Sequence, residues 1–379
     1  FKVGLLEESK GTWGLRGMIL HLMLAHLRKP GDDGKTPEEK GVIITGNISP
    51  DYMDINFTGR GEQMESIFKL ISQLFITSWI SEADFNMIKN EMLVARRGGS
   101  GPYYDIMTLF RKFFYRYYPY REPQSDYYNA ISSVSREKLC NFMKKYYVPD
   151  RAVVSVIFPG EVTGVKKMAK KYLGDISPGE SGLIDIPWEP VKQEREIRLN
   201  AYSNLGYVII GFPAPSADSM DRPVMEIIQA YLGEGFSSRL FVELREKRGL
   251  VYTPGCTYPT LTGPSYIIMF APTTPGKVRK VRNIMLDIVD DLKTRGIPPE
   301  HLRLCRSILK GKFLISTDDI MEKARVYGCA EVCGLGYQVE KNMPEKYDRV
   351  RSEDVMRVAR KYFRNHTIIL INPGGFYIE

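Results

Sequence analysis

Histidine and cysteine are scarce in this chain of 379 residues, which holds four histidines and five cysteines. Five cysteines over such a length do not make the dense disulfide framework of small secreted domains, so we expect a reduced, intracellular setting. Four scattered histidines also assemble no Ser/His/Asp or Cys/His arrangement, so the sequence does not indicate a nucleophilic hydrolase.

Long apolar runs are absent as well. The richest stretches, residues 18–27 and 68–80, are interrupted by polar side chains such as His21 and Ser72, so neither has the length that a membrane span needs. The first six residues, Phe-Lys-Val-Gly-Leu-Leu, are typical of a strand and not of a signal peptide. We therefore predict a cytoplasmic protein with no membrane partner, and a targeting segment removed at an earlier stage stays open as an alternative.

The residues that are present have the usage of an ordinary globular protein. Hydrophobic residues make up 43% of the chain and charged residues 26%, which excludes wholesale disorder and a fibrous repeat. At roughly 100–200 residues per domain, the length indicates about two domains. The net charge of +8 permits a polyanionic partner and does not require one.

An internal repeat organises the chain. Residues 134–147 and 350–363 align without a gap at a constant offset of 216 residues, and both end in Lys-Tyr followed by an aromatic residue. Each segment places apolar residues at helical spacing, and each is followed by a β-branched stretch, at 153–158 and at 367–371, that Pro-Gly closes. Helix, aromatic pair, strand and turn recur in the same order, so the sequence predicts two copies of one domain.

The rest of each half follows the same plan. The predicted elements of the first half are strands at 3–6, 41–45 and 54–58 and helices at 15–27 and 63–79, and those of the second half are strands at 206–212 and 265–271 and helices at 223–232 and 277–293. Long helices that alternate with short strands indicate an α+β fold of two tandem α/β sandwich domains, each with helices over one face of a mostly antiparallel sheet.

A stretch rich in proline and glycine, residues 174–190, marks the join between the halves. We therefore expect an N-terminal domain at 1–176, an extended linker at 177–195 and a homologous C-terminal domain at 196–379.

One segment of the second half carries a longer pattern. Residues 235–252 read Gly-Phe-Ser-Ser-Arg-Leu-Phe-Val-Glu-Leu-Arg-Glu-Lys-Arg-Gly-Leu-Val-Tyr, and this string resembles the pitrilysin/insulinase family of zinc metallopeptidases, which includes mitochondrial processing peptidase. Leu173-Gly-Asp, Tyr118-Pro-Tyr and the turn at 46–51 sit where that family places similar residues. The resemblance covers essentially the whole chain, and it implies the duplicated LuxS/mitochondrial-processing-peptidase-like fold.

Arg245 and Tyr252 are the candidate substrate-binding residues of this string. Arg245 lies near the end of the expected helix, Gly249 can take the left-handed conformation of a C-terminal cap, and Tyr252 begins the next strand. A guanidinium and a phenol at this spacing can converge and donate hydrogen bonds to a peptide carbonyl oxygen, whereas the plain alternative is a surface arginine and a half-buried strand tyrosine. The resemblance implies the first role, because in active members of the family this pair holds the substrate backbone opposite the zinc site.

The zinc motif of that family is missing. Peptide-cleaving members carry His-x-x-Glu-His on the first long helix, where two histidines four residues apart bind zinc and the glutamate activates the metal-bound water. The matching window holds Gly17 and Leu20 at the first histidine and glutamate positions and keeps only His21. Glu91 matches the more distant glutamate that completes the coordination. His21 and Glu91 are therefore remnants of a degenerate metal site, and we predict no metal and no catalytic residue on this chain.

The resemblance thus implies a non-catalytic subunit of a heterodimeric zinc metallopeptidase. A homologous partner would supply zinc and the base, while Arg245 and Tyr252 would bind unfolded or short peptides in trans. Two alternatives stay open, namely a structural subunit with no peptidase role, like the core proteins of respiratory complexes in this family, and a self-sufficient peptidase with atypical zinc ligands.

Two further patterns have simpler explanations. Residues 110–121 interleave cations with aromatics, as single-stranded nucleic-acid binding requires, but an amphipathic helix that buries its aromatics is the preferred explanation. We accordingly predict no nucleic-acid partner. Cys329 and Cys333 lie four residues apart on an expected helix, and two thiols without further ligands indicate packed free thiols and not a metal site.

Overall fold

The computed structural model describes residues 1–9, 11–97, 106–116, 120–121, 124–179, 193–201 and 204–373. The chain forms two compact units, each with its own hydrophobic core. The first comprises Phe1–Gly99, Pro123–Asp185 and Ser316–Glu340, and the second comprises Ser100–Glu122, Ile186–Ile315 and Lys341–Glu379.

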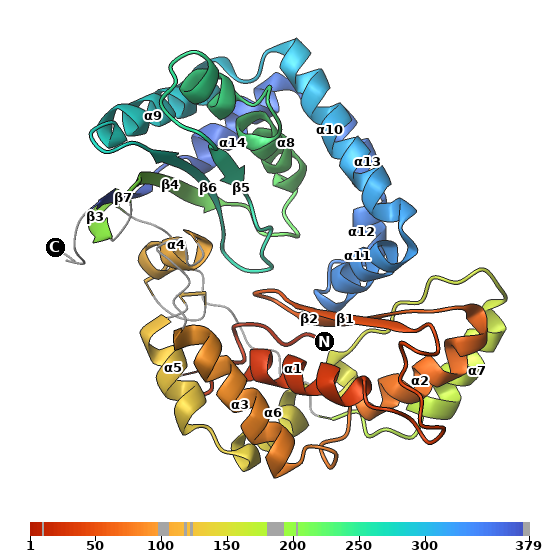
Figure 1. The fold of residues 1–379 in the computed structure, drawn as a ribbon. Helices are drawn as coiled ribbons and strands as arrows, with labels where there is room; N and C mark the ends of the chain where they lie inside the picture. The colour runs from red at the N-terminus through yellow and green to blue at the C-terminus, as the bar shows by residue number, and fades with distance from the viewer. Residues whose placement is uncertain are drawn as a thin grey trace. The chain divides into compact units, whose positions relative to one another are not determined.

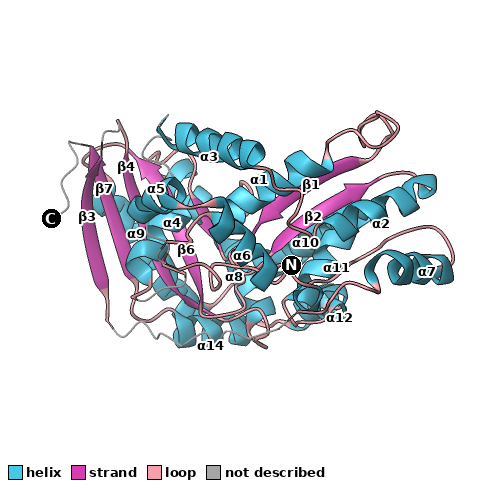
Figure 2. Cartoon of the chain, turned by 90° about the horizontal axis from the view of Figure 1, so that it is seen from below, coloured by secondary structure: helices cyan, strands magenta, loops and turns pink. Residues whose placement is uncertain are grey.

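An antiparallel pair of strands forms the sheet of the first unit. Strand β1 (Ile43–Ile48) pairs with β2 (Met53–Thr58), and the two lie side by side in Figures 1 and 2. Helix α1 (Leu15–Leu27) contacts β1 from one face and α11 (Ile320–Val332) contacts β2 from the other (Figure 1). Most residues of α1 are apolar and buried, which makes it the central helix of this core.

The remaining elements of the first unit surround this centre. They are the helices α2 (Met64–Gln73), α3 (Glu82–Arg97), α5 (Gln124–Ser133), α6 (Arg136–Tyr146) and α7 (Val162–Leu173) and the short turns η1 (Gly61–Gln63) and η2 (Pro149–Arg151).

The second unit is built on a five-stranded sheet of order β3-β7-β4-β6-β5. Its strands are β3 (Arg195–Ala201), β4 (Gly206–Ala214), β5 (Gly255–Thr257), β6 (Ser265–Thr273) and β7 (Thr367–Pro373). Only the β3–β7 pair is parallel among the described strands of this sheet, so the predicted mostly antiparallel sheet is confirmed.

Helices cover both faces of this sheet. One face is packed by α8 (Arg222–Gly233), α9 (Val278–Arg295) and α14 (Ser352–Tyr362), and the other by α4 (Ile106–Phe114) (Figure 1). A Cβ atom at Gly211 would lie 2.2 Å from the ring of Phe110, so this glycine lets α4 approach the strands closely. Further elements of the second unit are most of α10 (Pro299–Asp318), α13 (Met343–Arg349) and η3 (Phe241–Glu246), while α12 (Tyr337–Lys341) lies mainly in the first unit.

The repeated helices α6 and α14 bury equivalent positions. Leu139, Phe142 and Met143 of α6 are buried, and so are the three residues found 216 positions later in α14, which are Val355, Val358 and Ala359. The aromatic residues that follow the two helices, Tyr147 and Phe363, are both only 2% exposed. The α+β architecture with helices over sheets, predicted from the sequence, is therefore confirmed.

Two predicted strands and part of one predicted helix are wrong. Residues 3–6 bend into a turn, and residues 153–158 form no ladder, because no neighbouring strand within the described chain pairs with them. The helix expected at 63–79 ends at Gln73, before the β-branched pair Ile76-Thr77, where hydrogen-bonded turns replace it.

The compact units differ in extent from the predicted domains. Residues 100–122 belong to the second unit and residues 316–340 to the first, so neither unit is one continuous piece of chain. The units group residues by contact and not by sequence repeat, so the domains at 1–176 and 196–379 stay a prediction. Most of the expected linker, residues 180–192, lies outside the described residues.

Among the described residues, no helix combines the length and the apolar composition that crossing a bilayer requires.

Candidate functional site

Arg245 projects from a short π-helix. Lys247 donates its backbone N–H to the carbonyl oxygen of Val242 at 3.0 Å, a span of five residues that is typical of η3 and wider than the α-helical span. Gly249 then takes a left-handed conformation, with φ of 57°, and donates its N–H to the carbonyl oxygen of Arg245 at 2.9 Å. Gly249 thus closes the helix as its position in the sequence predicts.

Arg245 and Tyr252 converge, as their spacing predicts. The guanidinium carbon lies 4.6 Å from the centroid of the Tyr252 ring and 4.9 Å from that of Phe241, so the cation is held between two aromatic faces. The Nη1 of Arg245 also donates a 2.9 Å hydrogen bond to the carbonyl oxygen of Tyr252. The geometry fixes the guanidinium, whereas the role of the pair in binding stays a prediction.

Both residues keep unused hydrogen-bond donors. Within the described chain, Arg245 makes one hydrogen bond with its five N–H donors, and the hydroxyl of Tyr252 makes none. The side chain of Tyr252 is 74% exposed. These donors are therefore available to a carbonyl oxygen from outside the chain.

An exposed aromatic ring lies close to Arg245. Phe236 is 77% exposed, and its ring packs against that of Phe241 at a centroid distance of 5.2 Å. Neither Phe236 nor Phe241 was predicted from the sequence as part of the site. The sequence did hold a signal for Phe236, which follows Gly235 at a turn. The turn itself does not require a large apolar side chain, so an exposed phenylalanine there indicates a surface for binding.

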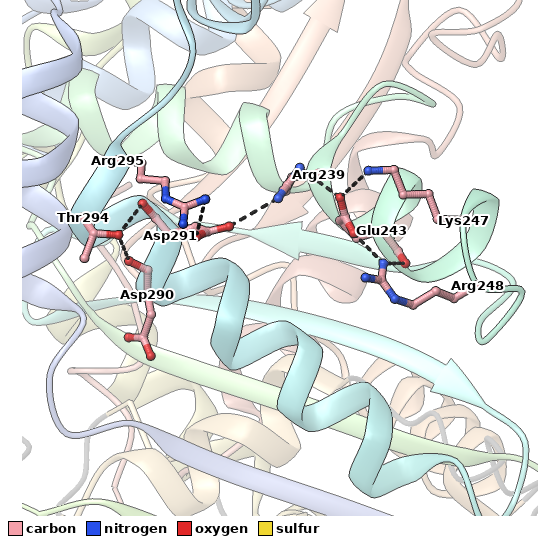
Figure 3. Close-up of polar contacts among 8 residues, drawn as sticks. All are labelled: Arg239, Glu243, Lys247, Arg248, Asp290, Asp291, Thr294 and Arg295. Atoms are coloured by element: carbon pink, nitrogen blue, oxygen red, sulfur yellow. Dashed lines mark hydrogen bonds and ion pairs between the residues drawn. The ribbon is translucent and has the colours of Figure 1, made fainter.

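A buried carboxylate anchors η3 to the neighbouring helix. Glu243 is 6% exposed and pairs with Arg239 and Lys247, at 2.9 and 2.8 Å, and with Arg248 (Figure 3). Arg239 also reaches Asp291 of α9 at 3.3 Å. Burial raises the pKa of Glu243, but hydrogen bonds from Lys247 and Arg248 and the charge of Arg239 outweigh it and lower the pKa to about 2. Glu243 is therefore ionised at neutral pH and holds the turn from which Arg245 projects.

An apolar cavity opens beside Tyr252. It encloses about 570 Å³ within the second unit. Its lining residues are Ile106, Leu205, Tyr207, Gly249, Leu250, Val251, Tyr252, Thr253, Phe270, Pro272, Thr273 and Thr274. A peptide held at the guanidinium could place an apolar side chain in this cavity.

The remnants of the zinc motif lie on two different helices. His21 on α1 and Glu91 on α3 are both exposed, and no group of three or more His, Cys, Asp or Glu residues in the described chain is placed to hold a metal ion. Leu20, at the position of the general base, is 7% exposed, and its Cδ1 lies 2.6 Å from where a Cβ atom of Gly46 would stand. An apolar side chain packed on β1 therefore takes the place of the glutamate.

His26 and the predicted cysteine pair, Cys329 and Cys333, are partly buried. His26 stacks on Trp79 at 4.3 Å, and burial lowers the pKa of His26. Burial raises the pKa of the Cys329 thiol to about 11 and that of Cys333 to about 12, as in packed, protonated thiols.

The aromatic and basic segment at 110–121 packs inward. Phe110, Phe114, Tyr115 and Tyr120 are buried, while residues 117–119 lie outside the described part. These four rings cannot serve as stacking platforms for bases, which favours the packing explanation over nucleic-acid binding.

Similar proteins come from bacteria. A family model described as "Peptidase M16 inactive domain" matches residues 133–309. The zinc protease PqqE of Helicobacter pylori is 21% identical over 98% of this chain and 86% of its own length. The uncharacterized zinc protease YmxG of Bacillus subtilis is 21% identical over 65% of this chain and 60% of its own length.

Solved structures share the fold over nearly the whole chain. A protease from Helicobacter pylori gives a TM-score of 0.86 at 19% identity, covering 98% of this chain and 92% of that one. The peptidase M16 inactive domain from Pseudomonas fluorescens gives a TM-score of 0.84 at 18% identity, and the match covers 99% of this chain and 91% of that one. The periplasmic protease PqqL from Escherichia coli gives a TM-score of 0.75 at 13% identity. That match includes 98% of this chain but only 42% of PqqL, which is the longer protein. At these identities the likeness shows the fold alone.

Proposed function

Since this chain belongs to the peptidase M16 (pitrilysin/insulinase) family and lacks the first histidine and the glutamate of its zinc motif, we propose that it is the non-catalytic subunit of a two-chain zinc metallopeptidase. Arg245 and Tyr252 bind the backbone of an unfolded or short peptide, and a homologous partner carries the zinc site. Zinc on that partner supplies an activated water for hydrolysis.

The free donors at Arg245 carry this proposal. The guanidinium is fixed between two rings and by one backbone hydrogen bond, so little side-chain entropy is lost when a ligand binds. Its remaining N–H groups and the exposed Tyr252 hydroxyl can donate to the carbonyl oxygens of an extended peptide. The exposed rings and the cavity beside Tyr252 suit apolar side chains of the same peptide.

The size of related proteins supports a paired arrangement. PqqL is more than twice as long as the region that this chain matches. The first half of PqqL alone also shares the fold, with a TM-score of 0.73 and 9% identity over 98% of this chain. PqqL is thus long enough to hold a second unit of this size, and two separate chains could divide such parts.

Reconstitution with a homologous chain that carries His-x-x-Glu-His tests the proposal. Cleavage of a quenched fluorescent peptide should require both chains, and Arg245→Ala should lower kcat/KM by about tenfold or more, since a charge-assisted hydrogen bond is worth roughly 1.5–3 kcal/mol. Arg349→Ala serves as the matched control, because Arg349 is exposed and pairs only with Glu345 in the described chain. Full activity of both Arg245→Ala and Tyr252→Phe in the complex would refute the substrate role.

The same preparations separate the two alternatives. A structural subunit would leave the partner's cleavage rate unchanged on addition. A self-sufficient peptidase would cleave alone and would contain one chelatable zinc ion per chain.

A further inference from the structure

Arg245 differs from the other cations of its segment because it has no carboxylate partner. Residues 239–248 contain four cations and two carboxylates. The three other cations all pair with the buried Glu243, and they are Arg239, Lys247 and Arg248 (Figure 3). Within the described chain, Arg245 forms no ion pair, and its one hydrogen bond goes to a neutral carbonyl oxygen. No ion pair of the fold therefore neutralises this guanidinium.

One edge of the Arg245 guanidinium is also free of hydrogen bonds. Phe241 and Tyr252 hold the group between their rings, with centroids 4.9 and 4.6 Å from the guanidinium carbon. Nη1 donates to the carbonyl oxygen of Tyr252 at 2.9 Å, whereas no described residue accepts a hydrogen bond from Nε or Nη2. Nε and Nη2 carry N–H groups that point the same way in one plane, so a ligand at this edge meets two donors at once.

A carboxylate suits this edge better than a peptide carbonyl does. Its two oxygen atoms can accept both N–H groups as a bidentate pair, whereas a carbonyl group offers one neutral oxygen. A carboxylate would also supply the countercharge that the fold does not provide. The rings of Phe241 and Tyr252 keep water away from the guanidinium, and the attraction between opposite charges is stronger where water is excluded.

The charge of the surrounding segment favours an anion as well. Four cations against two carboxylates leave residues 239–248 with a net charge of +2, and the whole chain has a net charge of +8. Glu246 is the carboxylate next to Arg245 in the sequence, and it is exposed, so water screens its repulsion of an incoming anion. A carboxylate bound at Arg245 would bring the segment closer to neutrality.

We propose that the Nε–Nη2 edge of Arg245 binds a carboxylate group of the peptide substrate, which leaves the hydroxyl of Tyr252 to donate to a backbone carbonyl oxygen. The carboxylate is either the C-terminus of the peptide or the side chain of an acidic residue, and both sources present the same group to the guanidinium. This inference rests on the function proposed above, because it concerns the same peptide site. It narrows the substrate class to peptides that end at the site or carry an acidic residue there.

Peptide binding to the full chain tests the inference and identifies the source of the carboxylate. Three fluorescein-labelled probes of equal length are compared by fluorescence anisotropy: Gly-Ala-Gly-Ala-Leu as the free acid, the same peptide as the C-terminal amide, and Gly-Glu-Gly-Ala-Leu amide. At least one of the two carboxylate-bearing probes should bind about fivefold or more tightly than the plain amide, because its hydrogen bonds are charge-assisted. Tighter binding of the free acid identifies the C-terminus, and tighter binding of the glutamate peptide identifies a side chain.

Variants of Arg245 show whether this residue causes the preference. Arg245→Ala should abolish it, and Arg245→Lys, which keeps the charge but not the two parallel donors, should weaken it by about half or more on the logarithmic scale of affinity. Arg349→Ala, the exposed control used above, should keep it in full. A preference that survives Arg245→Ala would place the carboxylate elsewhere on the chain and would overturn the inference, and full preference in Arg245→Lys would refute the bidentate contact.

The parent chain alone separates this inference from the proposed function. Equal binding of all three probes, weakened equally by Arg245→Ala, would overturn the carboxylate inference and leave the peptide site at Arg245 in place. Absence of binding by every probe would overturn both. Should Arg245→Ala fail to fold, the comparison of free acid and amide on the parent chain and on Arg245→Lys still decides.

Discussion

Arg245 is bound by both the ring and the backbone of Tyr252, with the guanidinium carbon 4.6 Å from the ring centroid and Nη1 2.9 Å from the carbonyl oxygen. The two residues therefore form one structural element and not two independent contacts. A change at Tyr252 alters the surroundings of the guanidinium, while a change at Arg245 removes a hydrogen bond to the backbone of Tyr252. This coupling allows the ring and the hydroxyl of Tyr252 to be tested separately.

Two substitutions at Tyr252 should have unequal effects. Tyr252→Phe keeps the ring and loses only the hydroxyl, so kcat/KM of the reconstituted complex should fall by roughly three- to tenfold, the value of one hydrogen bond. Tyr252→Ala also removes one of the two rings that hold the guanidinium, so kcat/KM should fall further than in Tyr252→Phe. Because the side chain is 74% exposed, both variants should keep the melting temperature of the parent chain. Equal losses in the two variants would mean that the ring does not position Arg245.

Glu243 should make stability depend on pH in the acid range. Its pKa is lowered from 4.5 to about 2 in the folded chain, so its contribution is complete above about pH 4.5 and is lost as the pH falls toward 2. Glu243→Gln should lower the free energy of unfolding by on the order of 3 kcal/mol at pH 7, and the difference from the parent should shrink between pH 4.5 and pH 2.

Urea unfolding at a series of pH values measures this difference. The control is Glu246→Gln, because Glu246 is exposed and makes no ion pair within the described chain. A difference between Glu243→Gln and the parent that stays constant down to pH 3 would contradict the ion-pair explanation.

Gly249 should be needed for the site as well as for stability. Its φ of 57° lies in the left-handed region, and no atom stands within 4 Å of where its Cβ would be. Alanine at this position would therefore strain the backbone without clashing with any neighbouring atom. Gly249→Ala should cost about 1 kcal/mol in the free energy of unfolding. Gly276→Ala, with φ of 83° and equally open surroundings, should cost about the same. Only Gly249→Ala should reduce cleavage in the complex, because only Gly249 closes η3 between Arg245 and Tyr252.

Helices with a continuous apolar pattern could be predicted from the sequence almost to the residue. The helix expected at 15–27 is α1, and the one expected at 277–293 is α9 with shifts of one or two residues. The buried face of each helix can be predicted from its own segment, because apolar residues recur at every helical turn. Strands at 3–6 and 153–158 failed because a strand exists only when a neighbour pairs with it, and the β-branched residues of one segment carry no information about that neighbour.

The candidate site was predictable where it depends on neighbouring residues in the sequence, and not where it depends on distant ones. The spacing of Arg245 and Tyr252 around Gly249 is local, and their convergence followed from it. The π-helical turn and the exposed rings around Arg245 were not predicted, because the turn depends on Glu243 and on Arg239, which is tied to Asp291 of another helix. The spacing of Arg239, Glu243 and Lys247 at four-residue steps was a usable signal for this ion-pair network.

Metal content tests the prediction that this chain carries no zinc of its own. The parent chain, purified alone, should contain zinc well below one ion per chain, because His21 is a single imidazole and Gly17, at the position of the other histidine, offers no ligand atom. Gly17→His restores a pair of imidazoles four residues apart on α1, and replacing a glycine within a helix should not weaken the helix. This variant should bind zinc and gain melting temperature when zinc is added, since a ligand that binds only the folded state stabilises it. Adding His21→Ala to the variant should abolish both effects. One tightly held zinc ion in the unaltered chain, lost on His21→Ala, would instead show that His21 is a working ligand, and cleavage by the lone chain would then identify a peptidase with atypical zinc coordination.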